Sequence, residues 1–121
     1  MDLEDLIGPL PAPLGRWMLR RLVAGGVRYG HDFAILLVRG TDPADLSPLL
    51  RGADIFSSWD GGDLLALLPD TDRAGANRVA ERVREVTGAS VGAAHWGGDL
   101  AEDLLERAVR ALEADVAQPS A

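Results

Sequence analysis

The chain has 121 residues, of which 47% are hydrophobic and 26% are charged, and it contains no cysteine. This composition is typical of one globular domain with a single core, and it excludes disulfides and thiolate metal sites. The net charge of −7 argues against a nucleic-acid polymer as partner, because such binding needs a broad basic surface. No apolar run is long enough for a membrane span and no secretion signal begins the sequence, so we expect a soluble cytoplasmic protein.

The first half of the chain predicts a helix, a buried strand and a short helix. Residues 1–13 are rich in proline and are expected to form an extended lead-in. A helix is predicted from Leu14 to about Val27, ending near Gly25-Gly26, with one apolar face made of Leu14, Trp17, Met18, Leu22 and Val23. The run FAILLV (33–38) predicts a strand buried on both faces, and a turn with a short helix follows near Pro43.

The second half predicts a hairpin and then helix, strand and helix. Strands at 54–59 and 63–68 flank a tight Asp-Gly-Gly turn. A helix follows the capping stretch 69–72 and ends at Thr87-Gly88, a strand covers 89–96, and Asp99 is expected to cap the last helix. The whole predicts an α/β sandwich over 14–116, with about four strands, helices packed on the sheet and a frayed tail at 117–121.

Several stretches of the sequence, in order, resemble the GGDEF domain of diguanylate cyclases, a palm-like polymerase fold. They are DLIGPLPAPLGRWMLRRL, RYGHDFAILLV, DGGDLLALLPDTDRAGANRVAERVRE, ASVGAAHW and DLLERAVRALEAD. The third stretch is the closest, because it has counterparts of the signature turn, the second hairpin strand, the Pro-Asp-Thr sequence and the next helix. The resemblance implies a GGDEF-type fold, with the signature turn at Asp60, Gly61, Gly62, Asp63 and Leu64.

The resemblance also shows departures where a cyclase would hold metal ions. The family binds two divalent cations through carboxylates that include the end of the first strand, and these ions activate the triphosphate and the attacking hydroxyl. Here Arg39 occupies the carboxylate position, and a cation there repels Mg²⁺. In the family, the segment that follows this strand supplies contacts to guanine and phosphate. That segment is deleted from the present sequence after Arg39. From these departures we expect a degenerate domain that is not an enzyme, with no catalytic residue, metal or cofactor.

A second family feature is retained. Cyclases of this family often carry an inhibitory site for their product, cyclic di-GMP, built on Arg-x-x-Asp five residues before the signature turn. Arg51 and Asp54 have that spacing here, and Arg82 stands at the position of a further arginine from the next helix. A guanidinium suits a guanine edge or a phosphate, and Asp54 could accept from guanine N–H groups.

Simpler interpretations of the same residues remain open. Arg51 and Asp54 could form only a local ion pair, and Asp60 and Asp63 could simply form the turn. His31 and His95 lack metal-ligand spacing, and His95 is expected to be half-buried on its strand. Trp17, Trp59 and Trp96 are expected to pack in or beside the core, with Trp59 a candidate for an interface.

The resulting hypothesis is a catalytically inactive GGDEF-like domain that binds cyclic di-GMP through Arg51, Asp54 and Arg82 and signals to a protein partner, with a homodimer as a further possibility. One alternative is a protein-interaction scaffold that binds no nucleotide. Another is a minimal cyclic-oligonucleotide polymerase, which the Gly-Gly-Asp turn followed by LLALLP also resembles.

Overall fold

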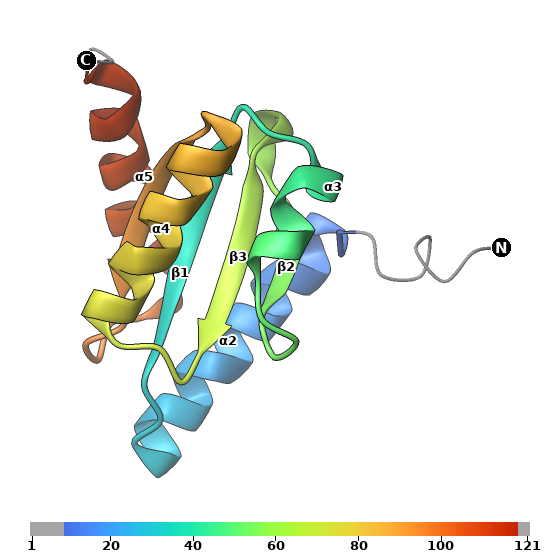
Figure 1. The fold of residues 1–121 in the computed structure, drawn as a ribbon. Coiled ribbons are helices and arrows are strands. Elements are labelled where there is room, and N and C mark those ends of the chain that lie inside the picture. The colour runs from blue at the N-terminus through green and yellow to red at the C-terminus, as the bar shows by residue number, and fades with distance from the viewer. Residues whose placement is uncertain (1–8, 119–121) are drawn as a thin grey trace, which may run out of the picture.

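A four-stranded antiparallel sheet forms the centre of the computed structural model, which describes residues 9–118 (Figure 1). The strand order is β2-β3-β1-β4, so β1 lies between β3 and β4. Six consecutive residues of β1, from Phe33 to Val38, are buried, as the continuous apolar run predicted. The strands are β1 (Phe33–Arg39), β2 (Ile55–Ser58), β3 (Leu64–Pro69) and β4 (Ser90–His95).

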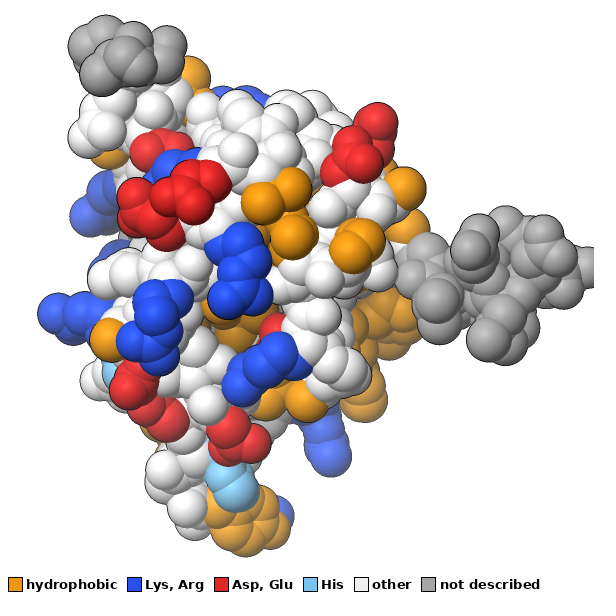
Figure 2. Space-filling view, viewed as in Figure 1, with side chains coloured by type: hydrophobic (Ala, Val, Ile, Leu, Met, Phe, Trp, Pro, Cys, Tyr) orange, Lys and Arg blue, Asp and Glu red, His pale blue; other side chains and the backbone are white. Residues whose placement is uncertain are grey.

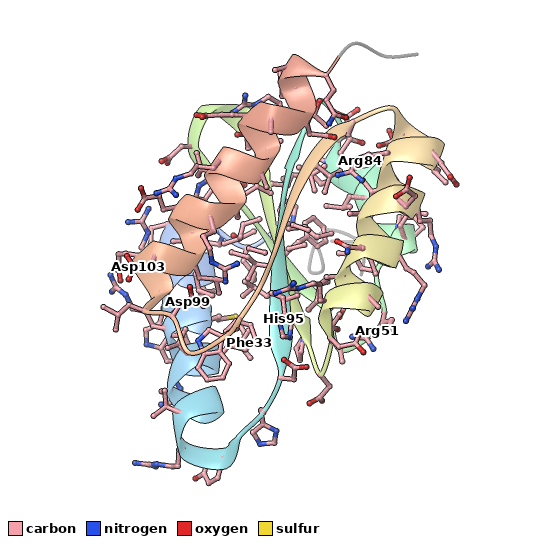
Figure 3. The ribbon with its side chains drawn as sticks, turned by 90° about the vertical axis from the view of Figure 1, so that its left-hand side faces the viewer. Phe33, Arg51, Arg84, His95, Asp99 and Asp103 are labelled. Carbon is pink, nitrogen blue, oxygen red and sulfur yellow. The ribbon has the colours of Figure 1, made fainter. Side chains whose placement is uncertain are left out.

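Helices cover both faces of this sheet. One face is covered by α2 (Ala12–Tyr29) and α5 (Ala101–Ala117), and the other by α4 (Arg73–Thr87) and the short α3 (Pro43–Leu46). Figure 3 views the sheet from its edge and shows α4 on one side of it and α5 on the other. Each face has its own apolar core, one around Leu36 and Val83 and the other around Leu37 and Leu104. The predicted α/β sandwich with four strands is confirmed.

The first helix is longer than predicted. It begins at Ala12 and runs through Gly25-Gly26 to Tyr29, where Gly30 ends it in the left-handed conformation (φ 71°). Gly26 is not a helix end but a close-packing position, because a Cβ there would lie 2.6 Å from the Trp96 ring. The lead-in predicted over 1–13 lies mostly outside the described residues, which begin at residue 9.

Two helix starts test the capping predictions. Asp72 caps α4, since its carboxylate accepts a hydrogen bond of 2.7 Å from the Gly75 N–H, as expected. The predicted cap of α5 by Asp99 is wrong. Leu100 occupies the N-cap position, and Asp99 instead accepts from Arg107 and from the Gly97 N–H. Asp99 lies next to the start of the helix in the sequence, but its carboxylate does not bind the helix N-terminus because Arg107, about two turns into the helix, binds that carboxylate instead.

The apolar face predicted for the first helix is only partly buried. Met18, Leu22 and Val23 pack against the core, but Trp17 is 55% exposed and Leu14 is also exposed. Trp96 stacks on Phe33 with ring centroids 5.4 Å apart, as a core-side aromatic should.

Within residues 9–118, no helix combines the length and the apolar character that crossing a membrane requires.

Candidate functional site

A surface hollow of about 580 Å³ lies between the N-terminal half of α4 and the segments that flank β2 and β3. Figure 2 looks onto this face of the molecule and shows arginine side chains grouped near its middle, with acidic side chains beside them. All three residues predicted to bind the ligand line this one hollow. Its lining consists of Asp32, Leu49, Arg51, Asp54, Asp70, Thr71, Asp72, Gly75, Arg78, Val79 and Arg82.

Arg51 is held in place by several contacts. Its Nη2 donates to the Thr71 hydroxyl at 2.7 Å and to the Pro69 carbonyl at 2.8 Å. The same group lies 3.2 Å from the Asp54 carboxylate, which also accepts from the Arg51 backbone N–H at 2.8 Å. The Arg51 side chain stays 57% exposed. The guanidinium is therefore preorganised, while enough of it faces solvent to meet a ligand.

Asp54 is buried and paired, whereas a residue that accepts hydrogen bonds from guanine would need a free oxygen that faces the hollow. Its side chain is 1% exposed, and its oxygens accept from Arg51. The local ion pair that the Arg-x-x-Asp spacing allowed is thus present. In this arrangement Asp54 orients Arg51 and does not face the hollow with a free oxygen.

Arg82 reaches the hollow from α4 together with Arg78, which the sequence interpretation missed. The two arginines are four residues apart and therefore share one face of the helix. Within the part of the chain that the structure describes, neither forms an ion pair. The signal that could have identified Arg78 is its position one helical turn before Arg82 in the string RVAER.

The carboxylates around the hollow are largely engaged elsewhere. Asp72 caps α4, Asp54 holds Arg51, and Asp32 pairs with His95, which is half-buried as expected. Asp70 is mostly exposed and lies 4.0 Å from His31. The α4 wall of the hollow therefore presents two cations, Arg78 and Arg82, along one face of the helix, and these favour an anionic ligand.

The stretch that resembles the signature turn forms a tight turn, η2 (Asp60–Gly62), instead of a two-residue hairpin loop. Gly61 and Gly62 have φ of 68° and 86°, a region that favours glycine. The Trp59 N–H donates to the Asp63 carbonyl at 2.8 Å and closes the turn. Asp60 is exposed, which fits its expected role as a turn residue, whereas Asp63 is 7% exposed.

Asp63 forms a two-pronged ion pair with Arg39, and the sequence interpretation missed this pair. Arg39 Nε and Nη2 each donate to one oxygen of the Asp63 carboxylate at 2.9 Å. The pairing of β1 with β3 brings them together, since Val38 lies opposite Leu64 and the next residues along are Arg39 and Asp63. The hydrogen bond and the charge of Asp63 raise the pKa of Arg39, so this cation is held firmly.

A divalent cation of the kind that the resemblance implies does not fit this end of β1. Both Asp63 oxygens accept from Arg39, and the guanidinium lies where a metal would need further carboxylates. Within residues 9–118 no group of three or more His, Cys, Asp or Glu side chains is arranged to hold a metal ion.

Trp59 is half-buried beside the turn, with the Arg16 guanidinium 4.9 Å from its ring centroid.

Known protein families and curated proteins give no match to this sequence. Solved structures do match. The GGDEF domain of YfiN (TpbB) from Pseudomonas aeruginosa is 17% identical with a TM-score of 0.82, over 91% of this chain and 86% of that one. DgcB from Caulobacter crescentus, solved as a coiled coil and GGDEF domain in complex with c-di-GMP, is 13% identical with a TM-score of 0.82, over 93% and 78%.

A third match bears on catalysis. The diguanylate cyclase SiaD from Pseudomonas aeruginosa, solved in complex with its activator SiaC, is 23% identical with a TM-score of 0.75. The match covers 86% of this chain but only 54% of SiaD, so the chain spans about half of that protein. The prediction that the chain is not an enzyme is contradicted by this comparison, because a diguanylate cyclase is among the proteins that share its fold. The error was to infer a whole activity from substitutions in one turn and one strand end.

The resemblance seen in the sequence is confirmed at the level of the fold: the chain has the fold of a GGDEF domain.

Proposed function

We propose that this domain binds cyclic di-GMP in the hollow beside α4, with Arg51, Arg78 and Arg82 as its cationic contacts. The observation that carries the proposal is the convergence of Arg51 and Arg82 on one hollow, although they are far apart in the sequence and come from different elements. DgcB, solved as a coiled coil and GGDEF domain, was in complex with c-di-GMP, so a protein that contains this fold can bind that ligand.

The chemistry of the ligand matches the chemistry of the hollow. Cyclic di-GMP carries two phosphates and two guanine bases, and a guanidinium can form paired hydrogen bonds with either group. Arg78 and Arg82 form no ion pair with any residue between 9 and 118, and the guanidinium planes offer a stacking surface to the bases. Asp54 acts through Arg51, because its carboxylate fixes the direction of that guanidinium.

Isothermal titration calorimetry with cyclic di-GMP tests the proposal. Arg51→Ala should weaken binding by about 1–3 kcal/mol, or roughly fivefold to 150-fold, as expected for loss of a charge-assisted contact. Arg82→Ala should weaken it similarly. Arg110→Ala is the matched control, because it removes an exposed arginine from α5 on the opposite face of the sheet.

Two results would overturn the proposal. One is the absence of heat from the unmodified protein at high micromolar ligand, which would favour the scaffold alternative. The other is equal affinity for the Arg51→Ala and Arg110→Ala variants, which would place the ligand elsewhere. Cyclic di-AMP serves as a ligand control, since it keeps both phosphates and changes only the bases.

We further infer that the ligand state is passed on through a protein contact. SiaD was solved with an activator protein, so protein contacts occur in a protein with this fold. A ligand can shift a protein contact only by binding one state more tightly than the other. The test repeats the cyclic di-GMP titration on the domain bound to a protein partner. A partner that favours one ligand state changes the affinity of the domain for cyclic di-GMP, and an unchanged affinity contradicts the inference.

A further inference from the structure

The hollow beside α4 contains carboxylates as well as arginines, and the carboxylates differ in how they are engaged. Four aspartates line it, namely Asp32, Asp54, Asp70 and Asp72. Three of them already have partners, one in His95, one in Arg51 and one in the N-terminus of α4. The side chain of the fourth, Asp70, is 83% exposed, and the one ion pair that it forms within residues 9–118 is with His31 at 4.0 Å. That distance is beyond hydrogen-bonding range, so the Asp70 oxygens remain available to a ligand.

Asp70 also has an unusual backbone conformation. Its φ is 49°, and it is the one non-glycine residue between 9 and 118 with a positive φ. Aspartate and asparagine tolerate this left-handed region better than most residues, but it still carries a steric cost. The Asp70 N–H donates to the Asp32 carbonyl at 2.8 Å, which helps to fix the turn. Strained residues that their surroundings hold in place cluster at binding sites, and Asp70 is therefore a candidate for direct contact with the ligand.

The residues on both sides of Asp70 hold the Arg51 guanidinium. Arg51 Nη2 donates to the Pro69 carbonyl at 2.8 Å and to the Thr71 hydroxyl at 2.7 Å. The Thr71 hydroxyl in turn donates to the Pro69 carbonyl at 2.9 Å. Three consecutive residues thus fix a cation next to a free carboxylate, so that one flat ligand group can meet both.

Guanine is the base that matches an arginine beside a free carboxylate. It presents acceptors at O6 and N7, and next to O6 it presents the N1–H and N2–H donors. A guanidinium only donates and a carboxylate only accepts, so each meets its complement on neighbouring edges of one guanine. Adenine has an amino group in place of O6 and an acceptor at N1. It would therefore place a donor against the guanidinium and an acceptor against the carboxylate.

We propose that Asp70 accepts the hydrogen bonds from the N1–H and N2–H groups of guanine in this hollow and gives the domain a preference for guanine over adenine. This inference rests on the proposed binding of cyclic di-GMP and names the residue that selects the base. Asp54, to which the Arg-x-x-Asp spacing assigned the contact, instead positions Arg51, because its own oxygens accept from that residue. A polar site that matches the donors of one base is left unpaired by the other, which is a strong source of specificity.

Isothermal titration calorimetry with cyclic di-GMP and cyclic di-AMP tests the assignment through the ratio of the two dissociation constants. Both ligands carry the same two phosphates, so the ratio cancels the general gain in affinity that follows from removing a negative charge. The unmodified protein should bind cyclic di-GMP at least about tenfold more tightly than cyclic di-AMP. Asp70→Asn should lower that preference at least about tenfold, because an amide offers one donor and one acceptor and so matches the N1 and amino groups of adenine.

Two further variants separate charge from recognition. Asp72→Asn is the matched control, because it removes a carboxylate from the same hollow while asparagine still caps the helix. It should leave the ratio unchanged, even if both affinities rise together. Asp70→Gly keeps the left-handed backbone and removes the whole side chain, so it should lose the preference as well. Circular dichroism of every variant checks that the fold is intact.

The outcomes distinguish this inference from the proposed function. If cyclic di-GMP binds but the ratio is the same for Asp70→Asn and Asp72→Asn, Asp70 does not select the base, although the hollow can still be the binding site. A loss of preference in Asp32→Asn, with none in Asp70→Asn, would assign the contact to Asp32 and overturn the inference. No binding of cyclic di-GMP to the unmodified protein would overturn the proposed function, and this inference with it.

Discussion

Arg39 and Asp63 lie side by side on neighbouring strands and share two hydrogen bonds of 2.9 Å. The Asp63 side chain is 9% exposed, and half of the Arg39 side chain remains in contact with solvent. The pair joins the end of β1 to the signature turn. A buried carboxylate needs such a partner, because burial without one leaves a charge that is neither solvated nor paired.

Arg39→Met should therefore destabilise the domain, since it leaves the Asp63 carboxylate without its partner. We expect the midpoint of thermal unfolding at pH 7 to fall by about 5 °C. The double variant Arg39→Met/Asp63→Leu should recover most of the loss, because two apolar side chains can replace a buried pair. A double variant that is less stable than Arg39→Met would mean that the turn needs the carboxylate itself.

Gly25 and Gly26 are adjacent in α2 and should respond in opposite ways to alanine. A Cβ at Gly25 meets nothing within 4 Å, so Gly25→Ala should stabilise the helix by about 0.5–1 kcal/mol. A Cβ at Gly26 would lie 2.6 Å from the Trp96 ring, so Gly26→Ala should destabilise by about 1–3 kcal/mol. Urea unfolding measures both, and effects of the same sign would show that α2 does not pack as described.

The ion pair of Asp99 and Arg107 should make stability depend on pH. The hydrogen bond from Arg107, helped by the Gly97 N–H, lowers the pKa of Asp99 below its ordinary value. A carboxyl group whose pKa is lower in the folded state stabilises the fold above its unfolded pKa, near 3.8. That contribution is lost as the pH falls through the folded-state pKa.

Asp99→Asn should thus lower the unfolding midpoint by roughly 2–4 °C at pH 7, and the gap to the unmodified protein should close in acid. Thermal unfolding followed by circular dichroism from neutral pH to strongly acidic pH gives the comparison. Asp103→Asn is the control, because this exposed residue lies in the same helix and forms no ion pair with any residue between 9 and 118. A gap that stays constant over the whole pH range would contradict the assignment.

Thr71 should contribute to cyclic di-GMP binding without touching the ligand. Its hydroxyl accepts from Arg51 at 2.7 Å and donates to the Pro69 carbonyl at 2.9 Å, so it helps to orient the guanidinium. Thr71→Val should weaken binding by roughly threefold to tenfold, and Thr71→Ser should restore it because the hydroxyl returns. If Thr71→Ser binds as weakly as Thr71→Val, the effect comes from packing and not from the hydrogen bond.

Much of the fold could be predicted because its signals are local. The apolar run 33–38 predicted a strand buried on both faces, and the stretch 69–72 predicted a helix cap, because a cap and the donor it serves lie about three residues apart. The spacing of Arg51 and Asp54 allowed a local ion pair as the simpler alternative to a ligand site, and that ion pair is present. Trp17 was misplaced because a helical pattern shows which residues share a face, but not how far the neighbouring element extends over that face.

The sequence by itself determined the order of the elements, the alternation that buries β1, and the charge of each helix, because these depend on residues close together in the chain. Only the tertiary structure decided that Asp63 meets Arg39, that Arg51 faces Arg78 and Arg82 across one hollow, and that α2 and α5 share a face. These relationships depend on strand register and on helix placement. Both are set by burying the whole core at once, which no short stretch of sequence specifies.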